Sequence, residues 1–354
     1  MTSVALARPR ALATRLLPLA ALAAALAAGL LLIAATGVPL ARALSAFWDG
    51  VAASEYALVG SLLRAVPLAL VGLGFMISER ANLTNVGAEG QICLGGIAST
   101  ASALYGGAAQ LPGPLAFLYP LALGALAGAV WGAIAGALRA RRGSNEVIST
   151  LLLTFIALQL VYGSVQSEAL LRQPKTSAST LPESLEIPLP TQLPILPTES
   201  SLPLHLGLVL LPLAAAGTWL LLSHGALGLQ LRAVGQNELA SRRAGLPVGR
   251  LVVLAMSLSG ALGGLAGAIM IQGDQHYLTA GFSSGFGFDG LVIGLLARGS
   301  ALAAIGFALL FGCLRSGGLA MEMSAAVPSA IVVVCQGLIV IATAAAAAFD
   351  ARRT

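Results

Sequence analysis

The sequence predicts an all-α fold, a polytopic transmembrane helical bundle of about 8–10 spans that includes broken or re-entrant segments. Hydrophobic residues make up 57% of the 354 residues and charged residues only 9%, whereas a soluble domain carries about 25% charged residues. The 42 glycines favour close packing of membrane helices. An outer-membrane barrel would instead show segments of about ten residues with alternating polarity, and the apolar runs here are long and unbroken.

A helical span needs about 20 apolar residues. The apolar runs place ten candidate spans, at residues 16–38, 56–77, 88–107, 114–138, 147–166, 204–222, 251–271, 286–297, 301–319 and 327–348. The run at 286–297 is too short to cross a bilayer as one helix, so we expect half of a broken helix or a continuation of its neighbour. Basic residues before the first run allow a signal peptide. Residues 16–40 exceed the about 7–15 apolar residues of such a peptide, which favours an uncleaved first span.

The distribution of arginines predicts the orientation. If the N-terminus is cytoplasmic, alternating spans place most arginines on the cytoplasmic side: Arg80, Arg139, Arg141, Arg142, Arg232, Arg242, Arg243, Arg250, Arg298, Arg352 and Arg353. This bias follows the positive-inside rule, so both termini are expected in the cytoplasm. Residues 167–203, with seven prolines, then form an extracytoplasmic loop without a long helix, either a linker or a docking surface. Residues 224–250 form a cytoplasmic loop.

A short helix with both ends marked lies within residues 224–250. Asn237 can cap its N-terminus, and Glu238 lies in its first turn. The last turn and the stop signal follow as Arg242, Arg243, Gly245 and Pro247, where the glycine suits the left-handed position after a helix. A connection between spans needs no capped helix. We therefore expect it to dock on another protein; the alternative is a helix lying on the membrane surface.

Polar residues interrupt the apolar sequence at three places, and such residues mark pathways in membrane proteins. Segment 78–96 reads as a re-entrant or broken segment that lines a cavity, or else as a plain cytoplasmic turn. The residues at 145–146 head a span, where capping explains them as well as a site does. A glycine-flanked Asp289 heads the short run at 286–297, and glycine-broken half-helices indicate substrate sites in transporters. The pathway candidates are Asn82, Asn85, Glu89, Gln91, Asn145, Glu146 and Asp289.

We find no sequence signal for an enzyme. There is no nucleophile elbow and no HExxH motif, and the three cysteines and three histidines stand singly, so we predict no catalytic residues, metal or other cofactor. A nucleotide-binding P-loop requires GxxxxGK[ST], and Lys175, the only lysine, has no glycines before it. If the protein uses ATP, a separate subunit hydrolyses it.

Four motifs, in order, resemble permease subunits of bacterial ABC importers of the ribose, nucleoside and branched-chain amino acid class. The nucleoside and simple-sugar branch matches best. The motifs are LTNVGAEGQ at 83–91, GSNEVISTLLLT at 143–154, LRAVGQNELASRRAGL at 231–246 and GFGFDGLVIGLLAR at 285–298, with a fifth similar stretch at 327–339. Thr154 and Ala297 replace the asparagine and glycine usual in the family, and such changes bear on the choice of solute.

The resemblance implies a single transmembrane permease domain, 1–354, in the bacterial inner membrane, embedded in lipid and without a nucleic-acid partner. It implies a second permease subunit, the same or paralogous, an ABC ATPase subunit and an extracytoplasmic solute-binding protein. The capped helix would couple to the ATPase through Gly235, Asn237, Glu238, Arg242, Arg243 and Gly245. The expected solutes are nucleosides or related simple sugars. The alternatives are a permease for ribose-like sugars or branched-chain amino acids, and an ion-coupled secondary transporter that uses Glu89, Glu146 or Asp289.

Overall fold

The computed structural model describes residues 23–24, 27–175, 181–197, 202–338 and 341. This part of the chain is largely helical, and its only β-pairings are isolated bridges, which confirms the predicted all-α fold. The predicted spans at 16–38 and 327–348 lie partly outside the described residues.

Two compact units make up the chain. One comprises residues 1–61 and 311–354, and the larger unit comprises residues 62–310. The division falls within α3 (Glu55–Arg80) and α12 (Ala301–Ala325). The larger unit contains every residue named above as a site candidate. The expectation of one domain stays a prediction.

In the smaller unit, α2 (Leu40–Val51) follows helix Ala27–Ala35 with a bend of 115°. The helix is amphipathic, since Ala43 and Ala46 are buried whereas Trp48 is 62% exposed. Its buried face joins an apolar cluster with residues near the end of α12 and beyond it. Helix α2 is not among the predicted spans, because a helix with one polar face does not form a long apolar run in the sequence.

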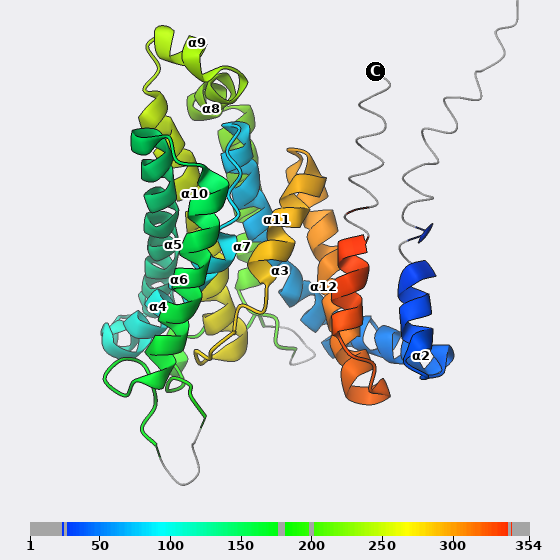
Figure 1. The fold of residues 1–354 in the computed structure, drawn as a ribbon. Coiled ribbons are helices and arrows are strands. Elements are labelled where there is room, and N and C mark those ends of the chain that lie inside the picture. Colours follow the sequence, from blue (N-terminus) through cyan, green and yellow to red (C-terminus); the bar gives the residue numbers. More distant parts are fainter. Residues whose placement is uncertain (1–22, 25–26, 176–180, 198–201, 339–340, 342–354) are drawn as a thin grey trace, which may run out of the picture. The chain divides into compact units, whose positions relative to one another are not determined.

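The larger unit is a helical bundle (Figure 1). After α3 come α4 (Ala88–Tyr105), η1 (Ala108–Gln110), α5 (Leu115–Arg142), α6 (Glu146–Gln166), η2 (Leu189–Thr191), α7 (Gly207–Ser223), α8 (Ala226–Gln236), α9 (Glu238–Arg243), α10 (Val248–Met270), η3 (Ile271–Gln275) and α11 (Phe286–Ala297). Figure 1 shows α4, α5, α6 and α10 side by side, with α8 and α9 at one end and the proline-rich loop at the other. The predicted spans in this unit agree with these helices to within a few residues.

Glycines bring α4, α5 and α10 into backbone contact. A Cβ atom added to Gly128 of α5 would lie 2.2 Å from the carbonyl oxygen of Gly260 in α10. A Cβ on Gly95 of α4 would lie 2.1 Å from the carbonyl oxygen of Gly264. Any side chain at these positions would force the helices apart. The high glycine content is therefore used for close helix packing, as is typical of membrane bundles.

Length and composition support five described helices as spans: α3, α5, α6, the continuous helix Val248–Gln275 and α12. Two bent pairs raise this number to seven, namely Ala27–Ala35 with α2, and α7 with α8, which are bent by 64°. Helix α11 is too short for the test, and α4 is not among the helices that pass it. The predicted count of about 8–10 spans stays a prediction, because two of those spans extend beyond the described residues.

Candidate functional site

The carboxylate of Glu89 joins the N-termini of two helices. Glu89 lies in the first turn of α4 and is only 3% exposed. Its Oε1 accepts a hydrogen bond from the amide of Gly285 at 2.9 Å, and its Oε2 accepts one from the amide of Gly287 at 2.6 Å. The N-cap residue of α11 is Gly285, which has no side chain to cap the helix. Glu89 therefore supplies the negative charge and the acceptors that the α11 N-terminus needs.

The contact between α4 and α11 requires glycine. A Cβ atom on Gly287 would lie 2.1 Å from the backbone nitrogen of Glu89. Further along α11, a Cβ on Gly290 would lie 2.5 Å from the Val71 side chain, and one on Gly294 would lie 2.7 Å from Phe75. Both of these neighbours belong to α3. The glycine repeat of the GFGFDGLVIG motif thus lets α11 pack closely against α4 and α3 at once.

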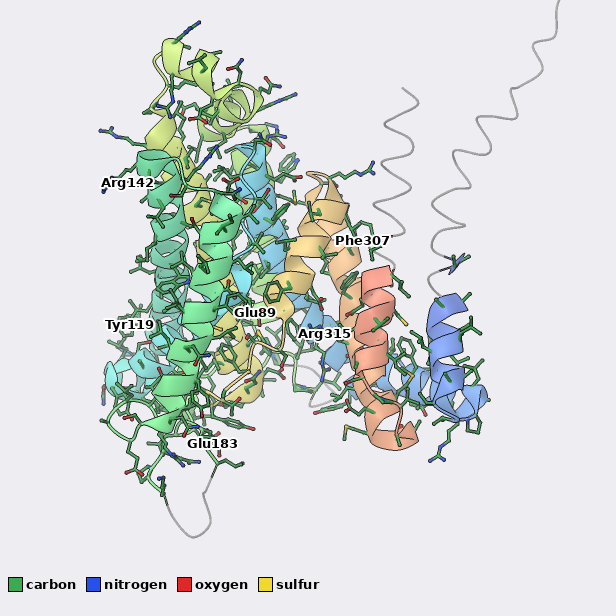
Figure 2. The ribbon with its side chains drawn as sticks, viewed as in Figure 1. Glu89, Tyr119, Arg142, Glu183, Phe307 and Arg315 are labelled. Carbon is green, nitrogen blue, oxygen red and sulfur yellow. The ribbon has the colours of Figure 1, made fainter. Side chains whose placement is uncertain are left out.

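Glu89 lies near the middle of the expected membrane thickness. Its neighbour Gly90 packs on Thr154, which is eight residues after Glu146 at the start of α6 and so about 12 Å along that helix. Helix α11 has 12 residues and extends about 18 Å. Both lengths are close to half of the hydrocarbon core, which is about 30 Å thick. Figure 2 likewise places Glu89 between the levels of Arg142 and Glu183.

A broken backbone therefore enters the interior of the bundle on both sides of this contact. Residues 81–87 connect α3 to α4 without regular structure, and residues 276–285 lead into α11. Buried side chains such as Leu83 and Phe282, each 4% exposed, cover these segments. Irregular backbone at membrane depth is tolerated only where protein or water covers it. This arrangement agrees with the broken segments predicted at 78–96 and 286–297.

Asn85 and Gln91 form a buried amide pair. The Asn85 amide group donates to Gln91 Oε1 at 3.1 Å and to Ser259 Oγ of α10 at 2.8 Å. In return, Gln91 Nε2 and the Gly87 amide donate to Asn85 Oδ1 at 3.2 and 3.0 Å. Both amide residues are at most 2% exposed. In this conformation they hold the 81–87 segment against α10 and do not face an open passage.

Apart from the two candidates at the start of α6, the pathway candidates with accessible side chains are Asn82 and Asp289. Asn82 is exposed, has a left-handed backbone with φ of 56°, and lines a cavity of about 450 Å³ at the α8 end of the unit. Asp289 is partly exposed in the first turn of α11, one turn from the Glu89 contact. Its neighbour Phe288 is 40% exposed. The structure thus separates the two from the buried Asn85–Gln91 pair.

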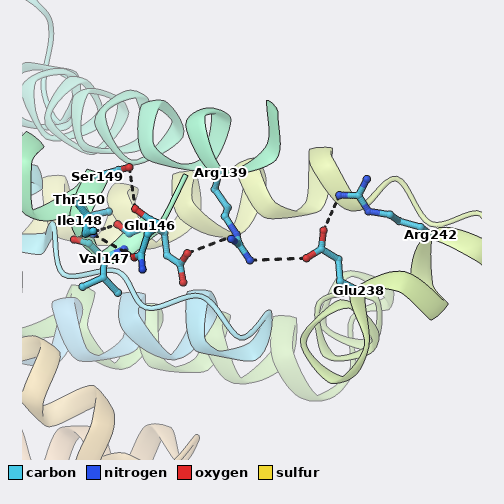
Figure 3. A network of polar contacts seen from close by, with 9 residues as sticks. Arg139, Glu146, Val147, Ile148, Ser149, Thr150, Glu238 and Arg242 are labelled. Carbon is cyan, nitrogen blue, oxygen red and sulfur yellow. Dashed lines mark hydrogen bonds and ion pairs between the residues drawn. The ribbon is translucent and has the colours of Figure 1, made fainter. Parts of the chain in front are cut away.

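Asn145 and Glu146 lie at the start of α6, at the end of the larger unit that carries α8 and α9. Asn145 caps α6, since its Oδ1 accepts from the Val147 amide at 2.9 Å. Glu146 and Glu238 both pair with Arg139 of α5, at 3.6 and 4.0 Å (Figure 3). These partly exposed ion pairs contribute little to stability. They connect the ends of α5 and α6 to α9.

The predicted capped helix is present as α9. Asn237 Oδ1 accepts from the Ala240 amide at 2.9 Å, and Arg242 pairs with Glu238 at 2.6 Å. Gly245 has the expected left-handed backbone, with φ of 84°. Gly235 lies in the preceding helix, where a Cβ atom would lie 2.5 Å from the Arg80 carbonyl oxygen, so α8 packs directly on the end of α3.

Helix α8 differs from the prediction of a loop with one short helix at residues 224–250, because residues 226–236 form a second helix. Its N-cap residue is Gly225, whose lack of a side chain leaves no capping signal in the sequence. The helix forms against the end of the bundle, where Leu231 is fully buried. Together, α8 and α9 form one end of the larger unit (Figure 1), and Arg242 and Arg243 of α9 are exposed.

The proline-rich loop is fixed to the other end of the larger unit. The amides of Ile187 and Leu193 each donate, at 2.8 Å, to the carbonyl oxygens of His276 and Gln272, respectively. The side chain of Gln272 returns a hydrogen bond to the Thr191 carbonyl oxygen at 2.7 Å. The described parts of this loop therefore form a cover on η3, with no long helix, as predicted.

His205 fixes the chain where this loop enters α7. Its Nδ1 accepts from the Gly207 amide at 3.1 Å. Burial lowers the pKa of His205 to about 4, an effect that Asp274 opposes and His276 reinforces. The ring is therefore neutral near pH 7, as the acceptor role of Nδ1 requires. Among the described residues, no group of three or more His, Cys, Asp or Glu side chains is arranged to hold a metal ion.

Comparison with known proteins identifies the family. The family model described as "Branched-chain amino acid transport system / permease component" matches residues 57–344. The guanosine ABC transporter permease protein NupP of Bacillus subtilis (strain 168) is 35% identical over 329 residues, 92% of each chain. The glucose ABC transporter permease protein TsgB13 of Haloferax volcanii is 34% identical, over 92% of this chain and 85% of the relative.

A third relative is the nucleoside ABC transporter permease protein NupB of Lactococcus lactis subsp. cremoris (strain MG1363), 30% identical over 79% of this chain and 78% of its own. Each of these three organisms also has a second, less similar relative, at 27% or 28% identity. No solved structure matches the chain significantly. The helical bundle, its broken half-helix and these matches show that the chain belongs to the branched-chain amino acid transport system permease family and is a permease subunit of an ABC transporter.

Proposed function

We propose that the chain is the permease subunit of an importer for nucleosides. The observation that carries this proposal is the similarity to the guanosine permease NupP, which extends over 92% of both chains. Related simple sugars are the second candidate, because the glucose permease TsgB13 is nearly as similar at 34% identity. Thr154 and Ala297 depart from the family motif at positions that bear on the choice of solute, so both solutes are included in the test below.

The second permease subunit is proposed to be a paralogue. Each of three organisms has two relatives of this chain, and one of each pair is more similar to it: 35% against 28%, 34% against 28%, and 30% against 27% identity. A homodimer would need only one such protein. The consistent ranking suggests that this chain corresponds to one member of a pair of different permeases.

The proposed solute pathway runs past the N-terminal turn of α11. Asp289 and Phe288 are accessible there at the expected membrane depth, and a carboxylate at that depth is costly against lipid hydrocarbon. A water-filled passage lined in part by a partner permease would accommodate both. Glu89, Asn85 and Gln91 then serve the pathway indirectly, by holding α11 in place.

Helix α9 is proposed to couple the permease to an ABC ATPase. Its caps make it a short rigid unit, and Gly235 and the Arg139 ion pairs tie α8 and α9 to the ends of α3 and α5. A push on α9 would thus be transmitted to the bundle. The arginines at this end support a cytoplasmic location for α9, and the proposed cytoplasmic location of both termini rests on the same positive-inside rule. The proline-rich loop would then face a solute-binding protein outside a bacterial inner membrane.

Uptake measurements test the solute. Cells that lack the gene for this chain should lose uptake of radiolabelled guanosine, and a plasmid copy should restore it, because the remaining subunits have no pathway. Uptake of labelled glucose should not change. Loss of glucose uptake with guanosine unaffected would favour the sugar permease, and no change in either would refute both candidates.

Two substitutions distinguish a residue that lines the proposed pathway from one that holds α11 in place. Asp289→Asn should lower guanosine uptake about tenfold, the effect expected for a lost charged contact, while the unfolding temperature stays unchanged. Glu89→Gln should lower both, since it weakens the buried bonds to α11 by about 1–3 kcal/mol. Asp274→Asn, an exposed carboxylate on η3, is the matched control. Normal uptake by Asp289→Asn would remove Asp289 from the pathway.

Charge reversal tests the coupling helix. Arg242→Glu combined with Arg243→Glu should abolish co-purification of the ATPase subunit while membrane insertion remains normal, because both side chains are exposed on α9. Lys175→Glu, at the opposite end of the larger unit, is the control and should co-purify the ATPase as the natural chain does. Undiminished ATPase recovery with the double variant would contradict the assignment.

A further inference from the structure

We propose that the α8 end of the larger unit holds one anionic phospholipid, with its phosphate among three arginines and an acyl chain in the groove between α7 and α12. The first observation is a cavity of about 450 Å³ lined by Arg80 of α3, Arg232 of α8 and Arg298 at the end of α11. Glu79 is the one carboxylate in the lining. This arginine cavity therefore carries a surplus of positive charge where three helices end.

The arginines of this cavity have hydrogen-bonding capacity to spare. Arg80 Nε is buried without a hydrogen-bond partner, and its Nη2 donates only to the Leu222 carbonyl oxygen, at 3.2 Å. In the described part of the chain, the ion pairs within 4.0 Å involve none of Arg80, Arg232 and Arg298. Buried donors in native proteins are normally satisfied, and guanidinium groups bind phosphate strongly.

One strained backbone position lies at the same cavity. Arg298 ends α11 in the left-handed region, with φ of 48°, where glycine or asparagine is usual. Asn82, with φ of 56°, also lines the cavity, but asparagine tolerates this region. Such strain persists where the surroundings enforce it, often at binding sites.

An apolar groove adjoins the arginine cavity. A second cavity, of about 520 Å³, is lined by Ala216 and Trp219 of α7 and by Leu302 and Ile305 of α12. The two cavities share Gly299. A charged compartment adjoining an apolar one fits an amphiphile better than a free phosphate, which would have no use for the groove.

The level of the groove suits a phospholipid. Trp219 is 51% exposed and lies edge-on to His224, with ring centroids 4.7 Å apart. Exposed tryptophans mark the membrane–water boundary, so the arginine cavity lies at headgroup level. From Ser223 to Pro212, both of which line the groove, α7 rises about 16 Å, and one leaflet of the hydrocarbon core measures about 15 Å. Basic pockets between helices bind anionic headgroups in this manner.

Lipid retention tests the headgroup site. The full-length chain in detergent is mixed with phosphatidylglycerol or with phosphatidylcholine of the same acyl chains, and bound lipid is measured by native mass spectrometry. The natural chain should retain phosphatidylglycerol preferentially. Arg232→Gln with Arg298→Gln should reduce that retention by about fivefold for each arginine. Arg141→Gln with Arg142→Gln, two exposed arginines outside the cavity, is the control, and Arg232→Lys with Arg298→Lys should retain most of the binding.

A larger side chain in the groove tests the acyl-chain site. Ala216→Phe should reduce retention of phosphatidylglycerol, whereas Gly217→Phe should not, because the next position on α7 is open to its surroundings. Equal retention of the two lipids would overturn the proposal, and so would an equal loss in the Arg141–Arg142 control. Displacement of phosphatidylglycerol by an equal concentration of inorganic phosphate would show a free-phosphate site and would also overturn it.

Discussion

The interior of the larger unit depends on one buried carboxylate. Glu89 accepts hydrogen bonds from the amides of Gly285 and Gly287 and thereby fixes the start of α11 inside the bundle, at a depth expected to be near the middle of the membrane. A carboxylate in apolar surroundings is unfavourable unless charge-assisted hydrogen bonds compensate for it. An uncapped helix N-terminus at the same depth would be unfavourable too. The carboxylate and the helix N-terminus each offset the free-energy cost of burying the other, so the half-helix α11 can begin inside the bundle.

Small residues make this arrangement possible. The N-termini of α4 and α11 touch because Gly287 has no side chain, and Gly128 and Gly264 bring α5 and α4 against α10 in the same way. The result is a tightly packed frame in which Phe288 and Asp289, in the first turn of α11, stay accessible. Helix α9, at the end of this frame, is the proposed contact with an ABC ATPase.

The apolar runs predicted most helices of the larger unit closely, and α11 to the residue, because a membrane imposes length and composition on each span. The caps of α9 could be predicted from the sequence because Asn237 and Gly245 lie at the two ends of one short helix. The role of Glu89 as hydrogen-bond acceptor for the start of α11 could not be predicted from the sequence, because its partners are 196 and 198 residues away along the chain. The same holds for Asn85, whose partner Ser259 lies in α10. Local patterns predict elements; these contacts depend on how elements pack.

Hydrogen exchange of the α11 amides tests the central contact most directly. In the natural chain, the amides of Gly285 and Gly287 should exchange as slowly as those in the middle of α11, since Glu89 accepts both. In the Glu89→Gln variant, exchange should accelerate at the start of α11, with little change at the far end of α5. Unaltered exchange at the start of α11 in the variant would show that the half-helix is held by other contacts and would contradict the account.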